Sequence, residues 1–209
     1  MRLALDHVIL AVPDLDHAAE ALERVLGLRA TRGGRHPTLG TENALVPVGG
    51  AYLELVAVAD EQAAATSAFG RSALAARNDG PRFTGWVART DDLDAAADGG
   101  RIVALSRETP DGGRLTWRMA ALERLGDEGV LPPLLSWDDE ASAPSFADPQ
   151  HPAGHITLDG VEIGDPDGEL AALPAVARLW IEPTEPRGVR CVHLLADGRE
   201  LLVTPTVVL

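Results

Sequence analysis

The chain has 209 residues, of which 45% are hydrophobic, and its formal net charge is −14. It contains no lysine, so all of its Lys-or-Arg cations are arginines. Its size suits one compact domain or two small ones. Its acidity argues against nucleic acids and anionic membranes as partners, since both are bound through clustered positive charge. The lack of lysine excludes Schiff-base chemistry, a lysine general base and a lysine-containing phosphate loop.

The single cysteine and the N-terminal run bear on location. Cys191 stands alone in an apolar stretch, so it forms no intrachain disulfide and is expected to be a small buried hydrophobe. The first apolar run is short and is interrupted by Asp6 and His7, so it fits neither a signal peptide nor a membrane span. We therefore expect a reducing, cytoplasmic location.

The first unit, residues 1–59, is predicted to place one helix among four strands. Asp14 can cap a helix that ends at Gly27, with apolar residues at helical spacing along one face. Alternating or apolar runs bounded by Gly and Pro predict the strands. These strands are expected at 5–12, around 28–31, at 41–48 and at 51–58. The order is β-α-β-β-β.

That order recurs, as in an internal repeat whose sequence identity has faded. An Asp-Leu-Asp tripeptide follows a strand at 14–16 and again at 92–94, and a Pro-Asp dipeptide recurs at 166–167. Further strands are expected near 82–90, 102–106, 114–119, 131–137, 156–163, 178–181, 189–195 and 200–204. The expected organisation is a first βαβββ unit at 1–59, a helical connector at 60–80, a second βαβββ-like unit at 81–138, a loop at 139–155, and a third, weaker βαβββ-like unit at 156–209.

Two polar residues interrupt strands that are otherwise apolar. Alternation puts His7 on the same face as Leu5 and Ile9, and Glu54 on the same face as Tyr52. A lone strand histidine is often a core residue satisfied by one or two hydrogen bonds. A lone glutamate can form a salt bridge or lie on a solvated edge. As a pair, His7 and Glu54 are also candidates for metal ligands or for a base and the group that orients it.

Several short motifs carry a family resemblance. They are LDHVI at 5–9, GRHP at 34–37, GTENAL at 40–45, YLEL at 52–55, LTWR at 115–118, SWD at 136–138 and HP at 151–152. Together with the repeated units they resemble the vicinal oxygen chelate superfamily, specifically its glyoxalase-like domain branch. The resemblance implies an α+β fold in which βαβββ half-units pair into curled sheets around a cleft, as in glyoxalase and bleomycin-resistance proteins. We expect the first and second units to form that pair.

The resemblance also implies a divalent metal, Fe, Mn, Zn or Ni, held by residues on the first and last strands of two units. Such a metal can grip two adjacent oxygens of a substrate. Here His7 and Glu54 are the implied ligands, but the positions that align with them in the other units are Gly85, Gly160 and Leu202. A mononuclear catalytic site normally needs at least three protein ligands.

A third ligand could come from elsewhere in the chain. His151 is the most attractive candidate, because its loop can place it over a cleft, although a His-Pro pair is ordinarily a turn. The other histidines considered are His36, His155 and His193. The alternative is that no metal is bound.

Without a metal, His7 could act as general base or hydrogen-bond donor, oriented by Glu54. The ligand-binding residues expected to shape the pocket are His36, Asn43, Trp117, Arg118, Trp137 and His151. Amide and indole N–H groups there would fix polar atoms of a mostly apolar ligand, and Arg118 could pair with a ligand carboxylate. The ordinary alternatives are that the tryptophans are core residues and that the arginine is exposed or internally paired.

Two functions remain open at this point. One is a metal-dependent lyase, isomerase or dioxygenase that acts on a small molecule with vicinal oxygens. The other is metal-free binding or sequestration of a small molecule, as in the bleomycin-resistance type. Because an odd number of half-units leaves sheet edges unpaired, a homodimer is also expected.

Overall fold

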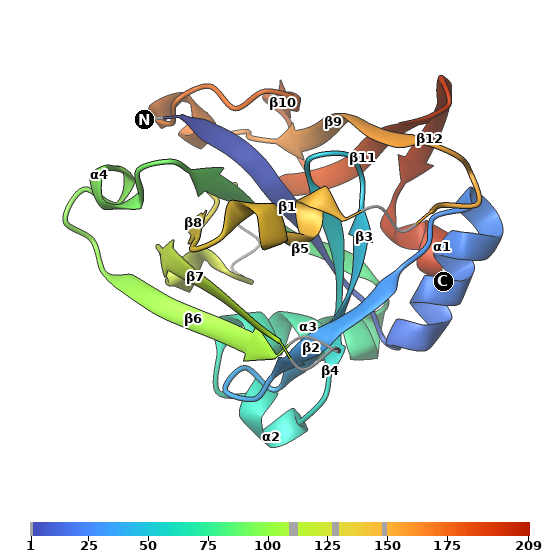
Figure 1. The fold of residues 1–209 in the computed structure, drawn as a ribbon, viewed down its shortest axis with the longest axis horizontal. Helices are drawn as coiled ribbons and strands as arrows, with labels where there is room; N and C mark the ends of the chain where they lie inside the picture. The colour runs from blue at the N-terminus through green and yellow to red at the C-terminus, as the bar shows by residue number, and fades with distance from the viewer. Residues whose placement is uncertain (1, 109–112, 127–129, 148–149) are drawn as a thin grey trace.

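The computed structural model describes residues 2–108, 113–126, 130–147 and 150–209. Within them the strands form one eight-stranded and one four-stranded sheet (Figure 1). In chain order the elements are β1 (Leu3–Ala11), α1 (Leu15–Leu26), β2 (Thr31–His36), β3 (Thr41–Pro47), β4 (Tyr52–Val58), α2 (Glu61–Ala64), α3 (Ala68–Asp79), β5 (Arg82–Thr90), α4 (Leu93–Ala97), β6 (Ile102–Glu108), β7 (Arg114–Ala120), η1 (Leu122–Arg124), β8 (Leu134–Trp137), η2 (Glu140–Ser142), η3 (Pro144–Phe146), β9 (Ile156–Gly164), η4 (Glu169–Ala172), β10 (Leu179–Glu182), β11 (Gly188–Ala196), β12 (Arg199–Val203) and η5 (Pro205–Val208).

The first helix has the bounds that the sequence predicts. Asp14 caps its first turn through the side chain, and Gly27 ends it in the left-handed region at φ 68°. The strand predicted around 28–31 is wrong in position, since β2 begins only at Thr31. The reason is that the Leu28 N–H still donates to a carbonyl of the last helical turn, so this residue closes the helix.

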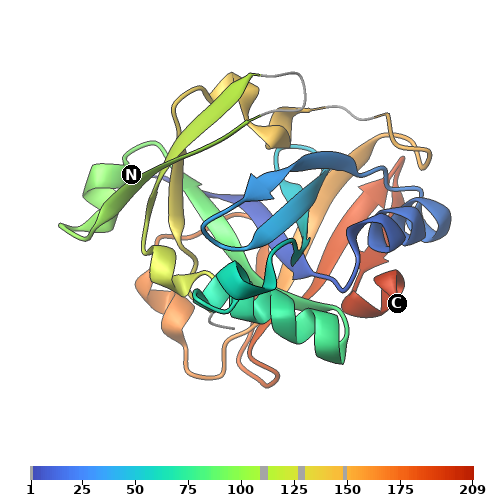
Figure 2. The same cartoon turned by 90° about the horizontal axis from the view of Figure 1, so that it is seen from below.

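The eight-stranded sheet has the order β2-β3-β4-β1-β5-β8-β7-β6. In each half the first strand pairs in parallel with the last, β1 with β4 and β5 with β8, and the two halves meet where β1 runs antiparallel to β5. The predicted pairing of two βαβββ units, the first with the second, is confirmed. The sheet curls until its edge strands β2 and β6 approach each other, and α3 lies across one end of the curl (Figure 2).

The third part of the chain forms the four-stranded sheet, in the order β10-β9-β11-β12. Here the first strand, β9, lies between β10 and β11, and the 3-10 turn η4 follows it where the other units have α1 and α4. Val161 and Leu194 of this sheet belong to the same buried cluster as Val8, Leu10 and Leu55 of the eight-stranded sheet. The four-stranded sheet therefore covers the outer face of the curl, and η5 packs beside α1 (Figures 1 and 2).

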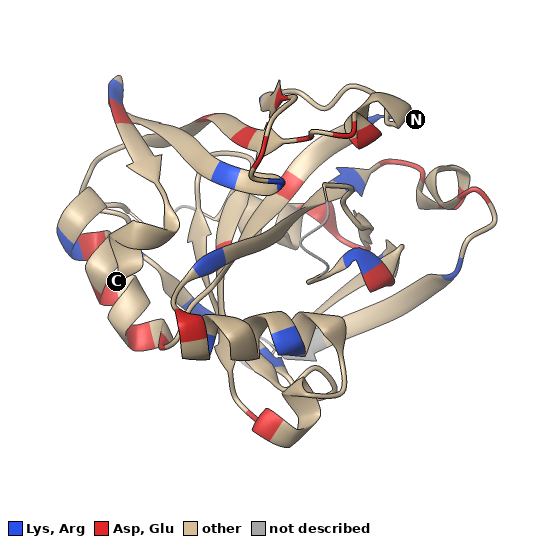
Figure 3. Ribbon diagram, turned by 180° about the vertical axis from the view of Figure 1, so that it is seen from behind, with Lys and Arg blue, Asp and Glu red and all other residues tan. Residues whose placement is uncertain are grey.

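Charged residues are spread over many elements. Figure 3 shows the arginines interspersed among Asp and Glu along the ribbon. No helix in the described ranges is both long and apolar enough to cross a bilayer. The expected homodimer and cytoplasmic location stay predictions.

Candidate functional site

A bulge in β1 brings two neighbouring side chains, Asp6 and His7, into contact. Leu5 and His7 pair with consecutive residues of β5, so Asp6 is the extra residue of the bulge. Its Oδ1 lies 2.7 Å from Nδ1 of His7. The bulge also shifts the alternation of side chains along the strand. Leu5 packs with Val8 in the buried cluster on the outer face of the sheet, whereas His7 points to the inner face. The prediction that His7 shares a face with Leu5 is therefore wrong.

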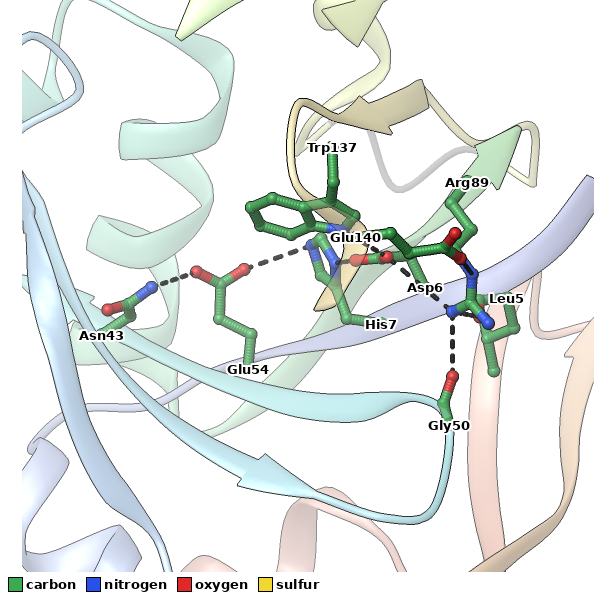
Figure 4. A network of polar contacts seen from close by, with 9 residues as sticks. All are labelled: Leu5, Asp6, His7, Asn43, Gly50, Glu54, Arg89, Trp137 and Glu140. Carbon is green, nitrogen blue, oxygen red and sulfur yellow. Dashed lines mark hydrogen bonds and ion pairs between the residues drawn. The ribbon is translucent and has the colours of Figure 1, made fainter. Parts of the chain in front are cut away.

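Asp6 is fully buried and holds the ring of His7 in one tautomer. Its second oxygen, Oδ2, accepts the indole N–H of Trp137 at 2.9 Å and lies 3.9 Å from a guanidinium nitrogen of Arg89 (Figure 4). Because both oxygens of an ionised carboxylate only accept, Nδ1 of the histidine must carry a hydrogen. The free end of the ring is then Nε2.

Glu54 of β4 faces that free end. Its Oε2 lies 3.4 Å from Nε2 of His7, and its Oε1 accepts the side-chain N–H of Asn43 at 2.5 Å (Figure 4). Asn43 is fixed in turn, because its Oδ1 accepts the backbone N–H of Gly34 at 2.7 Å. The two polar residues that interrupt the apolar strands thus meet in space, and both are more than nine-tenths buried.

When the His7 ring is neutral and carries its hydrogen on Nδ1, its contact with Glu54 places two acceptors opposite each other. A lone pair on Nε2 and a carboxylate oxygen attract only when a hydrogen lies between them. That hydrogen comes from the ring itself or from a bound molecule. The pair is therefore suited to take up or exchange a proton, or to bind a donor group.

His7 and Glu54 belong to the wall of a cavity of about 130 Å³ inside the curl. The ring of Tyr52 stacks on the imidazole of His7, with centroids 4.5 Å apart. The remaining wall is mostly apolar and comes from both halves of the sheet and from α3. The lining residues are His7, Ile9, His36, Thr38, Leu39, Asn43, Leu45, Tyr52, Glu54, Phe69, Leu105, Trp117, Met119, Leu122, Leu125, Leu135, Trp137 and Pro144.

Four of the side chains expected to shape a pocket line this cavity, namely His36, Asn43, Trp117 and Trp137. The rings of Trp117 and Trp137 lie 5.4 Å apart on neighbouring strands. Arg118 does not line it. Along β7 it alternates with Trp117 and Met119, which do, so it points to the other face and pairs with Asp94 at 3.4 Å.

The structure does not bring His151 to His7 and Glu54. Its Nδ1 accepts the backbone N–H of Arg29, and its Nε2 lies 2.8 Å from the carbonyl oxygen of Pro47. Both ring nitrogens are thus used to fasten the segment before β9 to the first unit. Of the other histidines considered, His155 is exposed and His193 lies on β11 beside Trp180.

The residues present do not fit a catalytic divalent metal. Exchanging the two halves of the sheet maps His7 onto Gly85 and Glu54 onto Pro133, and neither replacement has a donor side chain. The oxygen of Asn43 already accepts a hydrogen bond. In the described ranges no three His, Cys, Asp or Glu side chains are grouped to hold a metal ion. Two donors fall short of the usual three.

Two residues of the polar network, Asp6 and Arg89, were not predicted from the sequence. Each is a charged residue in an apolar strand, the same signal that pointed to His7 and Glu54. Arg89 donates to the carbonyl oxygens of Leu5 and Gly50 at 3.0 and 2.8 Å, so it ties β1 to the turn before β4.

Cys191 plays no part in this site. It is buried on β11, where desolvation, and then the negative charges of Glu162 and Glu200, raise the pKa of its thiol to about 11. A thiol with so high a pKa is a poor nucleophile at neutral pH. The prediction of a buried cysteine is confirmed.

A family model described as "Glyoxalase-like domain" matches residues 5–179. No curated protein matches the chain. Among solved structures, a hypothetical protein from Staphylococcus aureus is 15% identical, with a TM-score of 0.58 over 97% of this chain and 86% of that one. At that identity the similarity shows the fold.

Methylmalonyl-CoA epimerases are also similar in structure. The enzyme from Streptomyces coelicolor, in complex with 2-nitronate-propionyl-CoA, is 21% identical, with a TM-score of 0.48 over 66% of this chain and all of that one. The enzyme from Mycobacterium tuberculosis is 27% identical, with a TM-score of 0.44 over 63% and 86% of the two chains.

Proposed function

Because the chain belongs to the glyoxalase-like domain family, we propose that it binds a small organic molecule in the cavity between its two βαβββ units, without a metal ion. The observation that carries the proposal is the buried His7–Glu54 pair, whose Nε2 and Oε2 atoms lie 3.4 Å apart in the wall of a largely apolar cavity. Ligand sites commonly combine apolar walls with a few polar groups that fix orientation.

The volume of the cavity indicates how large a group it can hold. Its volume of about 130 Å³ is close to that of an engineered protein cavity of about 150 Å³ that binds benzene. A molecule with one ring, or a branched chain of similar bulk, fits this space. Trp117 and Trp137 would lie against it, so binding should change tryptophan fluorescence.

A titration with benzyl alcohol, an uncharged molecule with one ring, followed by calorimetry and by tryptophan fluorescence, tests the proposal. We expect saturable binding that EDTA leaves unchanged. Leu105→Trp, which puts a large ring into the cavity from β6, should weaken binding about tenfold or more. Leu202→Trp, at a side chain 43% exposed on β12, is the matched control and should bind as the wild type does. Equal binding by both variants, or loss of binding in EDTA, would refute the proposal.

Proton transfer by His7 is a second candidate function, favoured by its contact with Asp6. A carboxylate on Nδ1–H stabilises the imidazolium that forms when Nε2 takes a proton, which is the arrangement of a general base. The reaction class would be an isomerase or lyase step that starts by removing a proton next to a carbonyl group.

Deuterium uptake from D2O into phenylacetone, a one-ring carbonyl compound with an acidic methylene, tests this second candidate by proton NMR. We expect uptake faster than in buffer, with the acceleration lost in His7→Phe, which keeps a ring on Tyr52 but has no base. Uptake at the same rate in wild type and His7→Phe would leave binding as the function and exclude this step for the compound.

A further inference from the structure

The described side chains that line the cavity carry negative charge and no strong cation. Glu54 contributes a carboxylate, and His7 and His36 contribute imidazoles, but no arginine is among these lining residues. Arg89, the arginine in the polar network, lies on the far side of Asp6 and lines a separate, more polar pocket. A bound carboxylate or phosphate would therefore face Glu54 without a guanidinium to pair with it.

The hydrogen-bonding groups of the site also favour a cationic ligand. When the ring of His7 is neutral and donates Nδ1–H to Asp6, its Nε2 lone pair faces Glu54 Oε2 at 3.4 Å. A ligand that donates hydrogens to both acceptors relieves this opposition. An ammonium group supplies up to three N–H donors and the charge opposite to that of the carboxylate.

The aromatic walls also suit a cation. The rings of Tyr52, Phe69, Trp117 and Trp137 line the cavity, two of them in direct contact with each other. Aromatic faces attract ammonium groups, tryptophan most strongly, and the attraction grows when water is excluded. The same rings bury the apolar body of a ligand.

We infer that the ligand is an amine, bound as its ammonium ion between His7 and Glu54, with an apolar body about one ring in size, and that anionic ligands are rejected. This inference rests on the proposed function and narrows it to one class of ligand. The positive group would lie where Glu54 is held by Asn43, and the apolar body would lie against the tryptophans.

Three probes of nearly equal shape test the charge preference: benzylamine, which is a cation at neutral pH, benzyl alcohol and benzoate. Their affinities are measured by calorimetry and, independently, by the change in tryptophan fluorescence. We expect benzylamine to bind about tenfold or more tightly than benzoate, with benzyl alcohol between them. Benzoate binding as tightly as benzylamine overturns the inference but not the proposed function, whereas failure of all three probes to bind overturns both.

Glu54→Gln assigns the preference to one carboxylate, because the amide oxygen can still accept from Asn43. We expect benzylamine to lose about tenfold in affinity and benzyl alcohol to change by less than about threefold. Glu20→Gln, at an exposed position on α1, makes the same change in net charge and should alter neither affinity. Equal losses of benzylamine affinity in both variants would mean that overall charge, not Glu54, selects the ligand. Circular dichroism establishes that each variant is folded.

Discussion

Replacing Asp6 with alanine should lower the free energy of unfolding by about 3–5 kcal/mol, the range seen when one partner of a buried charge network is removed. The carboxylate has no exposed surface, and its loss leaves the N–H groups of His7 and Trp137 without an acceptor. Urea unfolding followed by circular dichroism measures the change. Asp14→Ala, which removes the N-cap of α1, is the control for the same substitution and should cost about 1 kcal/mol.

Asp6→Asn separates the role of Asp6 in stability from its role in setting the tautomer of His7. An asparagine fills the same space and can still accept from Trp137, so the loss of stability should be smaller, about 1–2 kcal/mol. Its amide N–H, however, would donate to Nδ1 and move the ring hydrogen to Nε2. Long-range nitrogen–proton NMR of the imidazole should report Nδ1–H in the wild type and Nε2–H in the variant. An unchanged tautomer, or a loss in Asp6→Ala no larger than in Asp14→Ala, would contradict the assigned role.

Local patterns predicted the part of the fold that depends on local physics. The helix bounds at Asp14 and Gly27 follow from a cap and a left-handed glycine, and the alternation along β4 places Tyr52 and Glu54 on the cavity side. The pairing of the first two units followed from the repeated Asp-Leu-Asp junction. Each of these signals lies within a short window of the chain.

The features that the sequence did not predict depend on contacts between distant segments. The bulge at Asp6 exists only in the pairing of β1 with β5, so strict alternation misplaced Leu5. The structure places His151 and Arg118 away from the cavity for the same reason. The hydrogen bonds of the His151 ring, and the direction in which Arg118 points from β7, depend on residues far away in the chain.

The candidate site was found because charge in an apolar strand has few explanations. His7 and Glu54 stood out in this way, and the same rule extends to Asp6 and Arg89, which complete the network. The metal that the resemblance implied depends on the second unit, where Gly85 and Pro133 occupy the matching positions. The described lining of the cavity therefore offers two candidate metal donors, His7 and Glu54, and its available chemistry is hydrogen bonding and proton transfer at His7.

Leu194→Ala should lower the free energy of unfolding by about 2–5 kcal/mol, as expected for a leucine with no exposed surface. Leu194 of β11 lies in the cluster that joins the four-stranded sheet to the outer face of the curl, and that cluster also contains Trp86 of β5. The same substitution at Leu202, 43% exposed on β12, should cost less than about 0.5 kcal/mol.

The shared cluster further implies that the two sheets unfold together, since neither can expose its inner face to water without a large hydrophobic penalty. Tryptophan fluorescence and circular dichroism should therefore give one coincident urea transition in wild type and in Leu194→Ala, with only the midpoint lowered. Two separated transitions would show that the four-stranded sheet is an independent domain. In that case β1, the strand that carries Asp6 and His7, would be stabilised by the first two units alone.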